Sequence, residues 1–206
     1  MNYYVVTNGL FEDSIFAFGE QVKSKNLGES VKCQECGTHL RMLKWLPPLE
    51  VNISKNKLGD FIFGTFVGIV VSNRFKTQYQ NSNLKGLDDF RKVSLFHKDK
   101  HIFKDYYYPE ITMAHVSMDL QYLDFKPFNP CSSCYVGNSI LNRIDKIVLS
   151  NPNQINLDIF FTSILGEGTI LISQRFKDFV ETEKFTNLKM IKSVDYKWDS
   201  LNPINY

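Results

Sequence analysis

The sequence predicts an α+β protein in which two related strand-helix-strand repeats are joined by one shared structural four-cysteine zinc site. Three observations support this prediction: two Cys-x-x-Cys pairs, a segment that occurs twice, and a similar spacing between pair and segment each time. Residues 67–76 share with residues 168–177 an apolar run followed by Ser, an amide residue, Arg, Phe and Lys. Because order and spacing both recur, we expect an internal duplication.

The repeat also predicts how the chain is organised. We expect a single compact domain over residues 1–206, with repeat halves at about 33–96 and 131–196. A chain of this length can remove roughly 70% of its unfolded surface from water on folding, which is enough for a real core. No segment has the composition of a flexible linker between independent domains.

A strand followed by a helix is expected at the centre of each half. Residues 69–71 and 170–172 are short apolar runs of high β propensity, which predict buried strands. Ser72 and Ser173 follow these runs at N-cap positions, where a hydroxyl can accept a hydrogen bond from a free backbone N–H group. We therefore expect a helix to begin after each serine.

The helices should each bury one face. In the first, Phe75 and Tyr79 lie four residues apart on one side; in the second, Phe176, Phe179 and Val180 form the apolar stripe.

Further strands complete the two halves. They are expected near residues 91–96 and 190–196, and the N-terminal residues 1–6 predict a first strand. Residues 44–48 contain two consecutive prolines and predict an extended or turning segment.

The four cysteines have the spacing of a closed metal site. Zinc prefers four soft ligands in a tetrahedron, and each Cys-x-x-Cys pair supplies two thiolates from one tight turn. A compact zinc ribbon has roughly 15–20 residues between its pairs, far fewer than this chain has. Two similar units packed about an approximate twofold axis would nevertheless bring both turns to one ion. We therefore expect one structural Zn²⁺ bound by Cys33, Cys36, Cys131 and Cys134.

Other uses of the cysteines remain as alternatives: a thioredoxin-like redox pair, disulfides, or free thiols. Neither pair has the strand-to-helix setting that lowers a redox cysteine's pKa. Cys36 is followed by Gly37, which suits the turn of a zinc knuckle, whereas Cys134 is followed by Tyr135. Four thiolates leave no open metal position, so hydrolytic chemistry is not expected.

Charge and hydropathy exclude several classes of partner. The chain has 24 Lys and Arg against 22 Asp and Glu, so no global field attracts nucleic acid or an acidic membrane. The most basic stretch, residues 85–104, also contains three aspartates and is better explained as a solvated face than as a phosphate-binding patch. The longest apolar run, residues 61–71, is well short of the ~20 residues of a membrane helix. With no signal peptide at the N-terminus, we expect a soluble, cytoplasmic protein with no membrane partner.

No motif argues for an enzyme. His97 and His101 are four residues apart and could share a metal on a helix, but their neighbours are charged and no second ligand set accompanies them. Arg74 and Arg175 occupy matching first-turn positions, where a residue kept through duplication is expected to contact the other half rather than to catalyse. The sequence contains no HExxH motif, phosphate loop or dinucleotide fingerprint, so we expect no catalytic residues.

Four short motifs resemble the double-CXXCG motif proteins: Cys33-x-x-Cys36-Gly37, Trp45-Leu46-Pro47-Pro48, Gly59-Asp60-Phe61 and Val71-Ser72-Asn73-Arg74-Phe75-Lys76. That family belongs to bacterial polymorphic-toxin systems, where its members are regarded as immunity proteins. Residues 172–177 are also similar to the closing motif of a broader group of such immunity domains. Two positions depart from the pattern: Gln34 stands where proline is common, and Tyr135 stands where the second motif has glycine.

The resemblance implies a non-enzymatic inhibitor that binds and neutralises a cognate toxin protein. A tight complex depends on a few buried aromatic or Arg anchors inside a polar rim. By composition, the candidates for partner binding are Tyr106, Tyr107, Tyr108, Tyr122 and Phe128. The alternative for these rings is a place in the core, and the alternative function is a zinc-ribbon-like nucleic-acid-binding module that uses residues 85–104.

Overall fold

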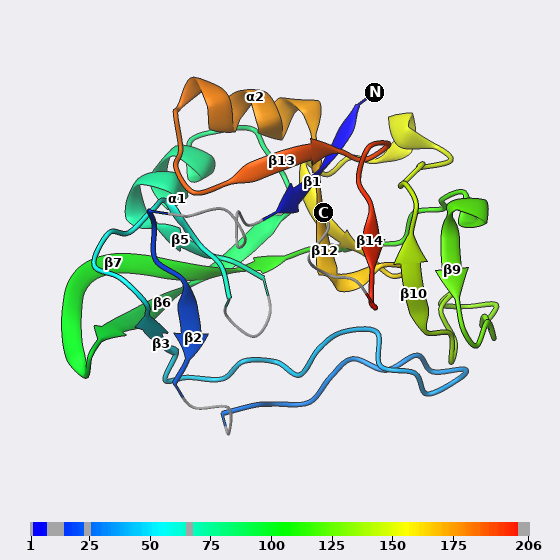
Figure 1. The fold of residues 1–206 in the computed structure, drawn as a ribbon, viewed down its shortest axis with the longest axis horizontal. Coiled ribbons are helices and arrows are strands. Elements are labelled where there is room, and N and C mark those ends of the chain that lie inside the picture. Colours follow the sequence, from blue (N-terminus) through cyan, green and yellow to red (C-terminus); the bar gives the residue numbers. More distant parts are fainter. Residues whose placement is uncertain (1, 8–14, 23–25, 65–67, 202–206) are drawn as a thin grey trace.

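The computed structural model describes residues 2–7, 15–22, 26–64 and 68–201, and these residues form an α+β fold dominated by strands (Figure 1). The fold class therefore agrees with the expectation from sequence. Met1 of the predicted first strand and Val67, the first residue of the repeated segment, lie outside the described residues.

Within these residues the strands form two large sheets and one small one. The first has the order β13-β1-β12-β11-β8, made by Lys189–Lys192, Tyr3–Thr7, Gly166–Ser173, Ile159–Thr162 and Met113–Ala114. The second has the order β2-β3-β6-β7-β5-β4, made by Gly19–Gln21, Glu50–Ile53, Leu87–His97, Lys100–Ile111, Val70–Ser72 and Phe61–Ile62. The small sheet has the order β14-β10-β9, made by Trp198–Asp199, Leu141–Ile144 and Leu123–Phe125.

The helices follow the strands that the sequence places before them. Helix α1 spans Asn73–Gln80 after β5, and α2 spans Gln174–Thr182 after β12. Short 3₁₀ turns occur at Leu120–Tyr122 and Pro152–Gln154. Neither described α-helix is long and apolar enough to cross a membrane.

Both N-cap predictions are confirmed. The Ser72 hydroxyl accepts a hydrogen bond from the backbone N–H of Phe75 at 3.1 Å, and the Ser173 hydroxyl accepts one from Phe176 at 3.2 Å. Each serine has extended backbone angles, as an N-cap residue should.

The two helices meet over a common core. Phe75 and Phe176, both fully buried, lie with ring centroids 6.2 Å apart. Tyr79 and Val180 are buried as predicted, and Phe179 is partly buried against the same core. This core also contains side chains from both large sheets, so it holds them together.

The same four-strand arrangement occurs in both large sheets. The order β4-β5-β7-β6 in one matches β11-β12-β1-β13 in the other, and each helix joins the second strand to the fourth. The register also matches, because Phe61 pairs with Val71 and Ile159 pairs with Ile172. The third strand is β7 in one sheet and the N-terminal β1 in the other, so residues 3–7 complete the sheet of the later half.

The last strand of the later half is shorter than expected. Residues 190–196 were expected to be extended, but β13 ends at Lys192 because the N–H of Asp195 bonds the carbonyl of Lys192 and closes a turn. The corresponding prediction at 91–96 lies within β6 and is confirmed.

Candidate metal centre and the contacts between the halves

The four cysteine sulfurs lie together although their pairs are far apart in the chain. Cys33 Sγ is 3.9 Å from Cys131 Sγ, and Cys36 Sγ is 3.7 Å from Cys134 Sγ. All four sulfurs lie within 4.8 Å of one another. Four thiolates about 2.3 Å from a tetrahedral ion would be separated by about 3.8 Å, whereas a disulfide has a length of about 2.05 Å. The group could therefore hold one metal ion.

Each Cys-x-x-Cys pair lies in a tight turn of the same form. The N–H of Gly37 donates to the carbonyl of Cys33 at 2.9 Å, and the N–H of Tyr135 donates to that of Cys131 at 2.8 Å. In the second turn the N–H of Gly137 also points to Cys134 Sγ at 3.3 Å. Such N–H groups stabilise negative charge on sulfur, which favours thiolate ligands.

Side chains also connect the two turns. Glu35 accepts hydrogen bonds from the Ser132 and Ser133 hydroxyls of the opposite turn, the first at 2.7 Å. From the first turn, the Thr38 hydroxyl donates a hydrogen bond to the carbonyl of Gly137 in the second turn at 2.8 Å. The turns therefore hold each other in place through protein contacts as well as through the sulfur cluster.

The thiols in this cluster differ in acidity. Hydrogen bonding with the side chain and the backbone of Thr38 lowers the pKa of the Cys36 thiol to about 6. Backbone hydrogen bonds from Cys134 and Ser133 act to lower the pKa of Cys131, but burial and the neighbouring thiols outweigh them and raise it to about 12. Sulfurs this close cannot all become thiolates unless a cation neutralises them. A bound metal ion would supply that charge.

Tyr135 occupies the place in its turn that Gly37 occupies in the other. Its φ is +64° and that of Gly37 is +74°, both in the left-handed region that favours glycine. The missing glycine of the second motif therefore does not change the shape of the turn, but a tyrosine in this conformation costs about 1 kcal/mol. Its side chain is 57% exposed, so burial offsets little of that cost.

We expect Tyr135→Gly to stabilise the protein by up to about 1 kcal/mol and Gly37→Ala to destabilise it by about the same amount. A Cβ at position 37 would meet nothing within 4 Å, so the cost comes from the backbone angle alone. Gly168→Ala is the matched control because it also has open space but no positive φ. Urea denaturation measures all three. If Gly37→Ala changes the free energy of unfolding no more than Gly168→Ala does, the backbone at these turns is not strained.

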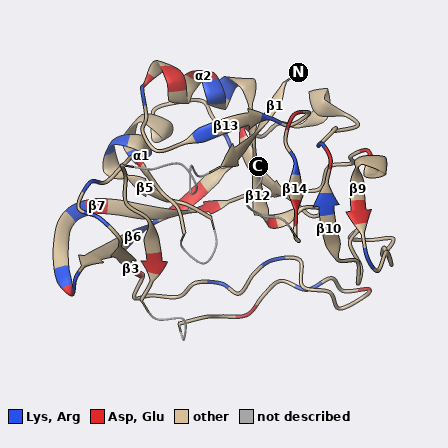
Figure 2. Cartoon of the chain, viewed as in Figure 1, with Lys and Arg blue, Asp and Glu red and all other residues tan. Residues whose placement is uncertain are grey.

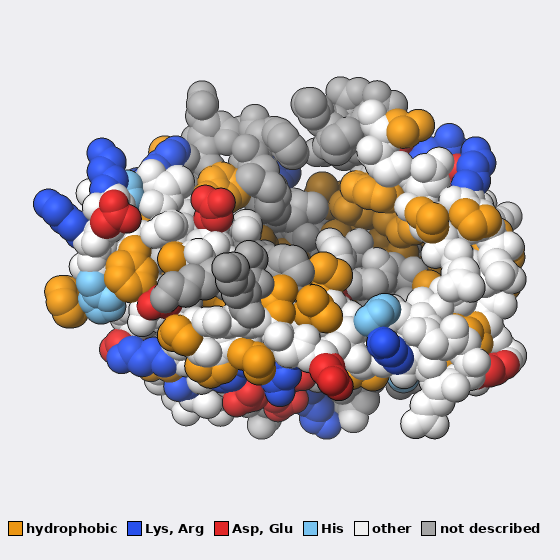
Figure 3. All heavy atoms as spheres, turned by 90° about the horizontal axis from the view of Figure 1, so that it is seen from below, with side chains coloured by type: hydrophobic (Ala, Val, Ile, Leu, Met, Phe, Trp, Pro, Cys, Tyr) orange, Lys and Arg blue, Asp and Glu red, His pale blue; other side chains and the backbone are white. Residues whose placement is uncertain are grey.

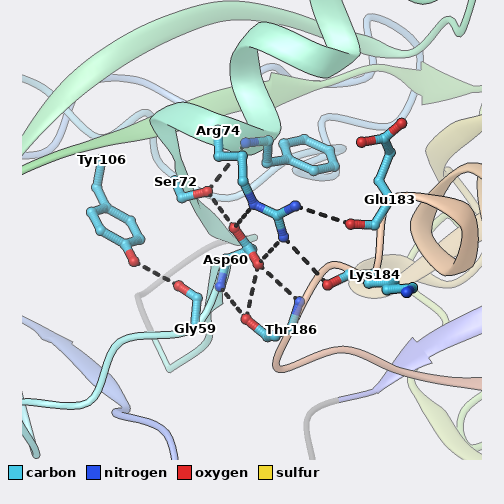
Figure 4. Close-up of polar contacts among 9 residues, drawn as sticks. Gly59, Asp60, Ser72, Arg74, Tyr106, Glu183, Lys184 and Thr186 are labelled. Atoms are coloured by element: carbon cyan, nitrogen blue, oxygen red, sulfur yellow. Dashed lines mark hydrogen bonds and ion pairs between the residues drawn. The ribbon is translucent and has the colours of Figure 1, made fainter.

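A second set of polar contacts joins the halves at Asp60, a buried residue just before β4 (Figure 4). Its carboxylate accepts hydrogen bonds from the Ser72 hydroxyl at 2.8 Å and from Arg74 Nε and Nη2 at 3.1 and 2.7 Å. It also accepts from the backbone N–H and the hydroxyl of Thr186, beyond α2, at 3.0 and 2.9 Å. One carboxylate therefore binds both the N-cap serine of α1 and the loop that follows α2 in the other half.

Arg74 extends this contact. Its guanidinium donates to the carbonyls of Glu183 and Lys184 at 2.9 and 3.3 Å (Figure 4). It also lies 4.4 Å from the ring centroid of Phe185. The prediction that this arginine contacts the other half is confirmed.

Asp158 makes the corresponding contacts in the opposite direction. It accepts from the Ser173 hydroxyl at 2.7 Å and from the backbone N–H of Lys85, beyond α1, at 3.0 Å. Arg175 forms an ion pair with Asp158 at 3.5 Å and donates to the carbonyl of Asn83 at 3.2 Å. Each half therefore supplies an Asp and an Arg that bind the loop following the other half's helix, and a Ser that donates to this Asp.

The environment of Asp60 favours its charged form. Burial alone would raise the pKa of this carboxyl, but the hydrogen bonds from Arg74, Ser72 and Thr186 outweigh burial and hold the pKa below its usual value. The aspartate is therefore ionised at neutral pH and paired with the Arg74 guanidinium.

Asp60 belongs to one of the motifs that resemble the family, but the sequence did not indicate its role, and Asp158 was not singled out although a signal was present. The two aspartates have the same separation along the chain as Cys33 and Cys131. Each also directly precedes an apolar strand segment that ends in Phe, so the repeat could have been extended to them.

The rings expected to bind a partner lie in different environments. Tyr106 and Tyr108 belong to the core rather than to the surface, with 5% and 9% exposure. Tyr107 and Tyr122 are half-buried, with the ammonium groups of Lys76 and Lys146 each 3.8 Å from their ring centroids. Phe128 is exposed, beside Phe125. The burial of Tyr106 and Tyr108 follows from the strand β7, which turns both of these alternate residues towards the core.

The two histidines are not brought together as metal ligands. They lie on a β-hairpin rather than on a helix: His97 Nδ1 lies 2.8 Å from the carbonyl oxygen of Ile53, and His101 is exposed and contacts Phe96. Among the described residues, the four cysteines are the group whose ligand atoms are close enough to share an ion.

Comparison with models of known protein families finds no match, and a search of curated proteins finds none either.

Proposed function

We propose that this protein is a non-enzymatic immunity protein of the double-CXXCG type, which binds and neutralises a cognate bacterial toxin in the cytoplasm. The observation that carries the proposal is the closed group of four sulfurs, contributed in pairs by turns far apart in the chain. This group coincides with the motifs that resemble the family, and the remaining motifs fall at Trp45, at Asp60 and at the β5–α1 junction.

Zinc is the ion that we assign to this group. Four thiolates at tetrahedral spacing suit Zn²⁺, and a closed site of this kind is structural rather than catalytic. Cys33, Cys36, Cys131 and Cys134 would hold the ion, whose role would be to connect the halves. A rigid inhibitor loses less conformational entropy on binding, so a cross-linked fold would favour a tight complex.

We also propose that the halves, at about 33–96 and 131–196, are related repeats. The reciprocal contacts of Asp60 and Asp158 support this, because each binds the N-cap serine of its own half and a loop of the other. The matched strand order and register support it as well. The shared ion would then lie near the approximate twofold axis that relates the repeats.

Co-expression with the toxin domain encoded by the neighbouring gene tests the function. We expect cells that produce the toxin alone to stop growing, and cells that also produce this chain to grow and to yield a co-purifying complex. Metal analysis of the purified protein should give about one zinc ion per chain. Absence of rescue together with absence of a complex would remove the immunity proposal, whatever the zinc content.

A further inference from the structure

The β6–β7 hairpin reaches beyond the rest of the fold and ends in an exposed turn at Lys98 and Asp99 (Figure 1). Phe103, near this end, is 89% exposed, the highest value for a large hydrophobic side chain in the described part of the chain. Its position therefore contributes little to the stability of the fold.

Phe103 belongs to a row of three rings. Its ring centroid lies 4.5 Å from that of His101, which in turn lies 5.4 Å from that of Phe96. Phe96 and His101 are direct partners across the hairpin, and His101 and Phe103 are alternate residues of β7, so all three share one face. Ile102, on the opposite face, packs against the core. One face of the hairpin thus packs against the core, and the ring row on the other face is exposed at His101 and Phe103 and partly buried at Phe96.

Unpaired positive charge flanks this row along the hairpin: Lys98 lies in the turn, and Lys100 and Lys104 are chain neighbours of His101 and Phe103 and therefore project from the opposite face. Lys98, Lys100 and Lys104 form no ion pair with any residue that the structure describes, and Asp99 is the one acidic residue between them. Lys92, further along the hairpin, is already paired with Asp105 at 2.7 Å. Basic side chains mark the hairpin end in Figure 2, and Figure 3 shows hydrophobic, histidine and basic side chains gathered at this end of the molecule. A complementary partner would present carboxylates.

We propose that the end of this hairpin, residues 96–104, is the element that inserts into the toxin. The ring row enters an apolar socket, while Lys98 in the turn and Lys100 and Lys104 on the other face of the hairpin meet carboxylates on the rim of that socket. This assignment rests on the proposed function. The end of the hairpin has the composition of a binding hot spot, in which an aromatic anchor is accompanied by polar groups at its rim. Single-stranded nucleic acid favours a basic groove that follows its backbone, whereas this element protrudes from the fold.

Binding of the inactivated toxin domain to purified variants tests the proposal. We expect Phe103→Ala to weaken binding by about 30-fold or more, the effect of removing a hot-spot ring, with an unchanged thermal midpoint. Val194→Ala, at an apolar residue that is 52% exposed outside the hairpin, is the matched control and should bind as the unsubstituted chain does. Lys100→Glu combined with Lys104→Glu should slow association most at low salt, whereas Lys197→Glu, at another exposed lysine, should not.

Each outcome decides the proposal. If the unsubstituted chain binds and Phe103→Ala binds equally well, the hairpin assignment is wrong and the immunity function stands. If Phe128→Ala abolishes binding while Phe103→Ala does not, the interface lies near β9 instead. If the unsubstituted chain does not bind the toxin domain, both proposals fall. Binding of a single-stranded RNA oligonucleotide that depends on Phe103 would overturn the assignment to a protein partner.

Discussion

Replacing Cys33 by Ser is expected to destabilise the protein by about 4 kcal/mol or more, and replacing Cys131 by Ser should cost the same. The two residues lie in different turns, but their sulfurs are 3.9 Å apart and belong to one cluster. A metal held by four thiolates loses most of its affinity when any one is removed, so the cost should not depend on which turn is changed. Urea denaturation of each variant with zinc present measures the cost.

Chelation provides the complementary measurement. Removing the metal with a strong chelator should lower the stability of the unsubstituted protein to near that of the serine variants and leave the variants themselves almost unchanged. Gln34→Ala is the matched control, because this exposed residue lies between Cys33 and Cys36 in the same turn and supplies no ligand. If Cys33→Ser is costly and Cys131→Ser is not, the two turns do not share one ion.

The spacing of residue types predicted the parts of this fold that depend on local chemistry. The apolar runs before Ser72 and Ser173 and the N-cap preference of serine were sufficient to place both strand-helix junctions. The cysteine cluster was also predictable, since two Cys-x-x-Cys pairs supply the four thiolates of a closed metal site.

Tertiary pairing could not be predicted in the same way. Nothing local to residues 3–7 indicates that this strand completes the later sheet, because its partners β12 and β13 are distant in sequence. The burial of Tyr106 and Tyr108 depends likewise on which face of β7 meets the core, and a one-residue shift in register would have exposed both. The ring row at Phe103 depends on the same choice of face.

Replacing Asp60 by Ala is expected to destabilise the protein by about 3 kcal/mol. Asp60 is 8% exposed, and its removal leaves the Ser72 hydroxyl and the Thr186 N–H without their acceptor in a site with little water. Asp158→Ala should have a smaller effect, because its ion pair with Arg175 is longer, at 3.5 Å, and the arginine side chain is 61% exposed. Thermal and urea denaturation measure both. The counterpart control is Asp145→Ala, which removes a surface ion pair and should change stability by less than about 1 kcal/mol.

The pH dependence of stability distinguishes the contribution of the Asp60 charge from that of its hydrogen-bond geometry. Because the folded protein holds the pKa of this carboxyl below its ordinary value of 3.8, its stabilising effect is complete above that pH. The effect is lost as the pH falls below 3.8 through the lowered pKa, where the folded protein takes up the proton. The stability difference between the unsubstituted protein and Asp60→Asn should therefore be constant from neutral pH to about pH 5 and shrink in stronger acid. A difference that stays constant down to pH 2 would mean that Asp60 joins the halves through hydrogen-bond geometry alone and not through its charge.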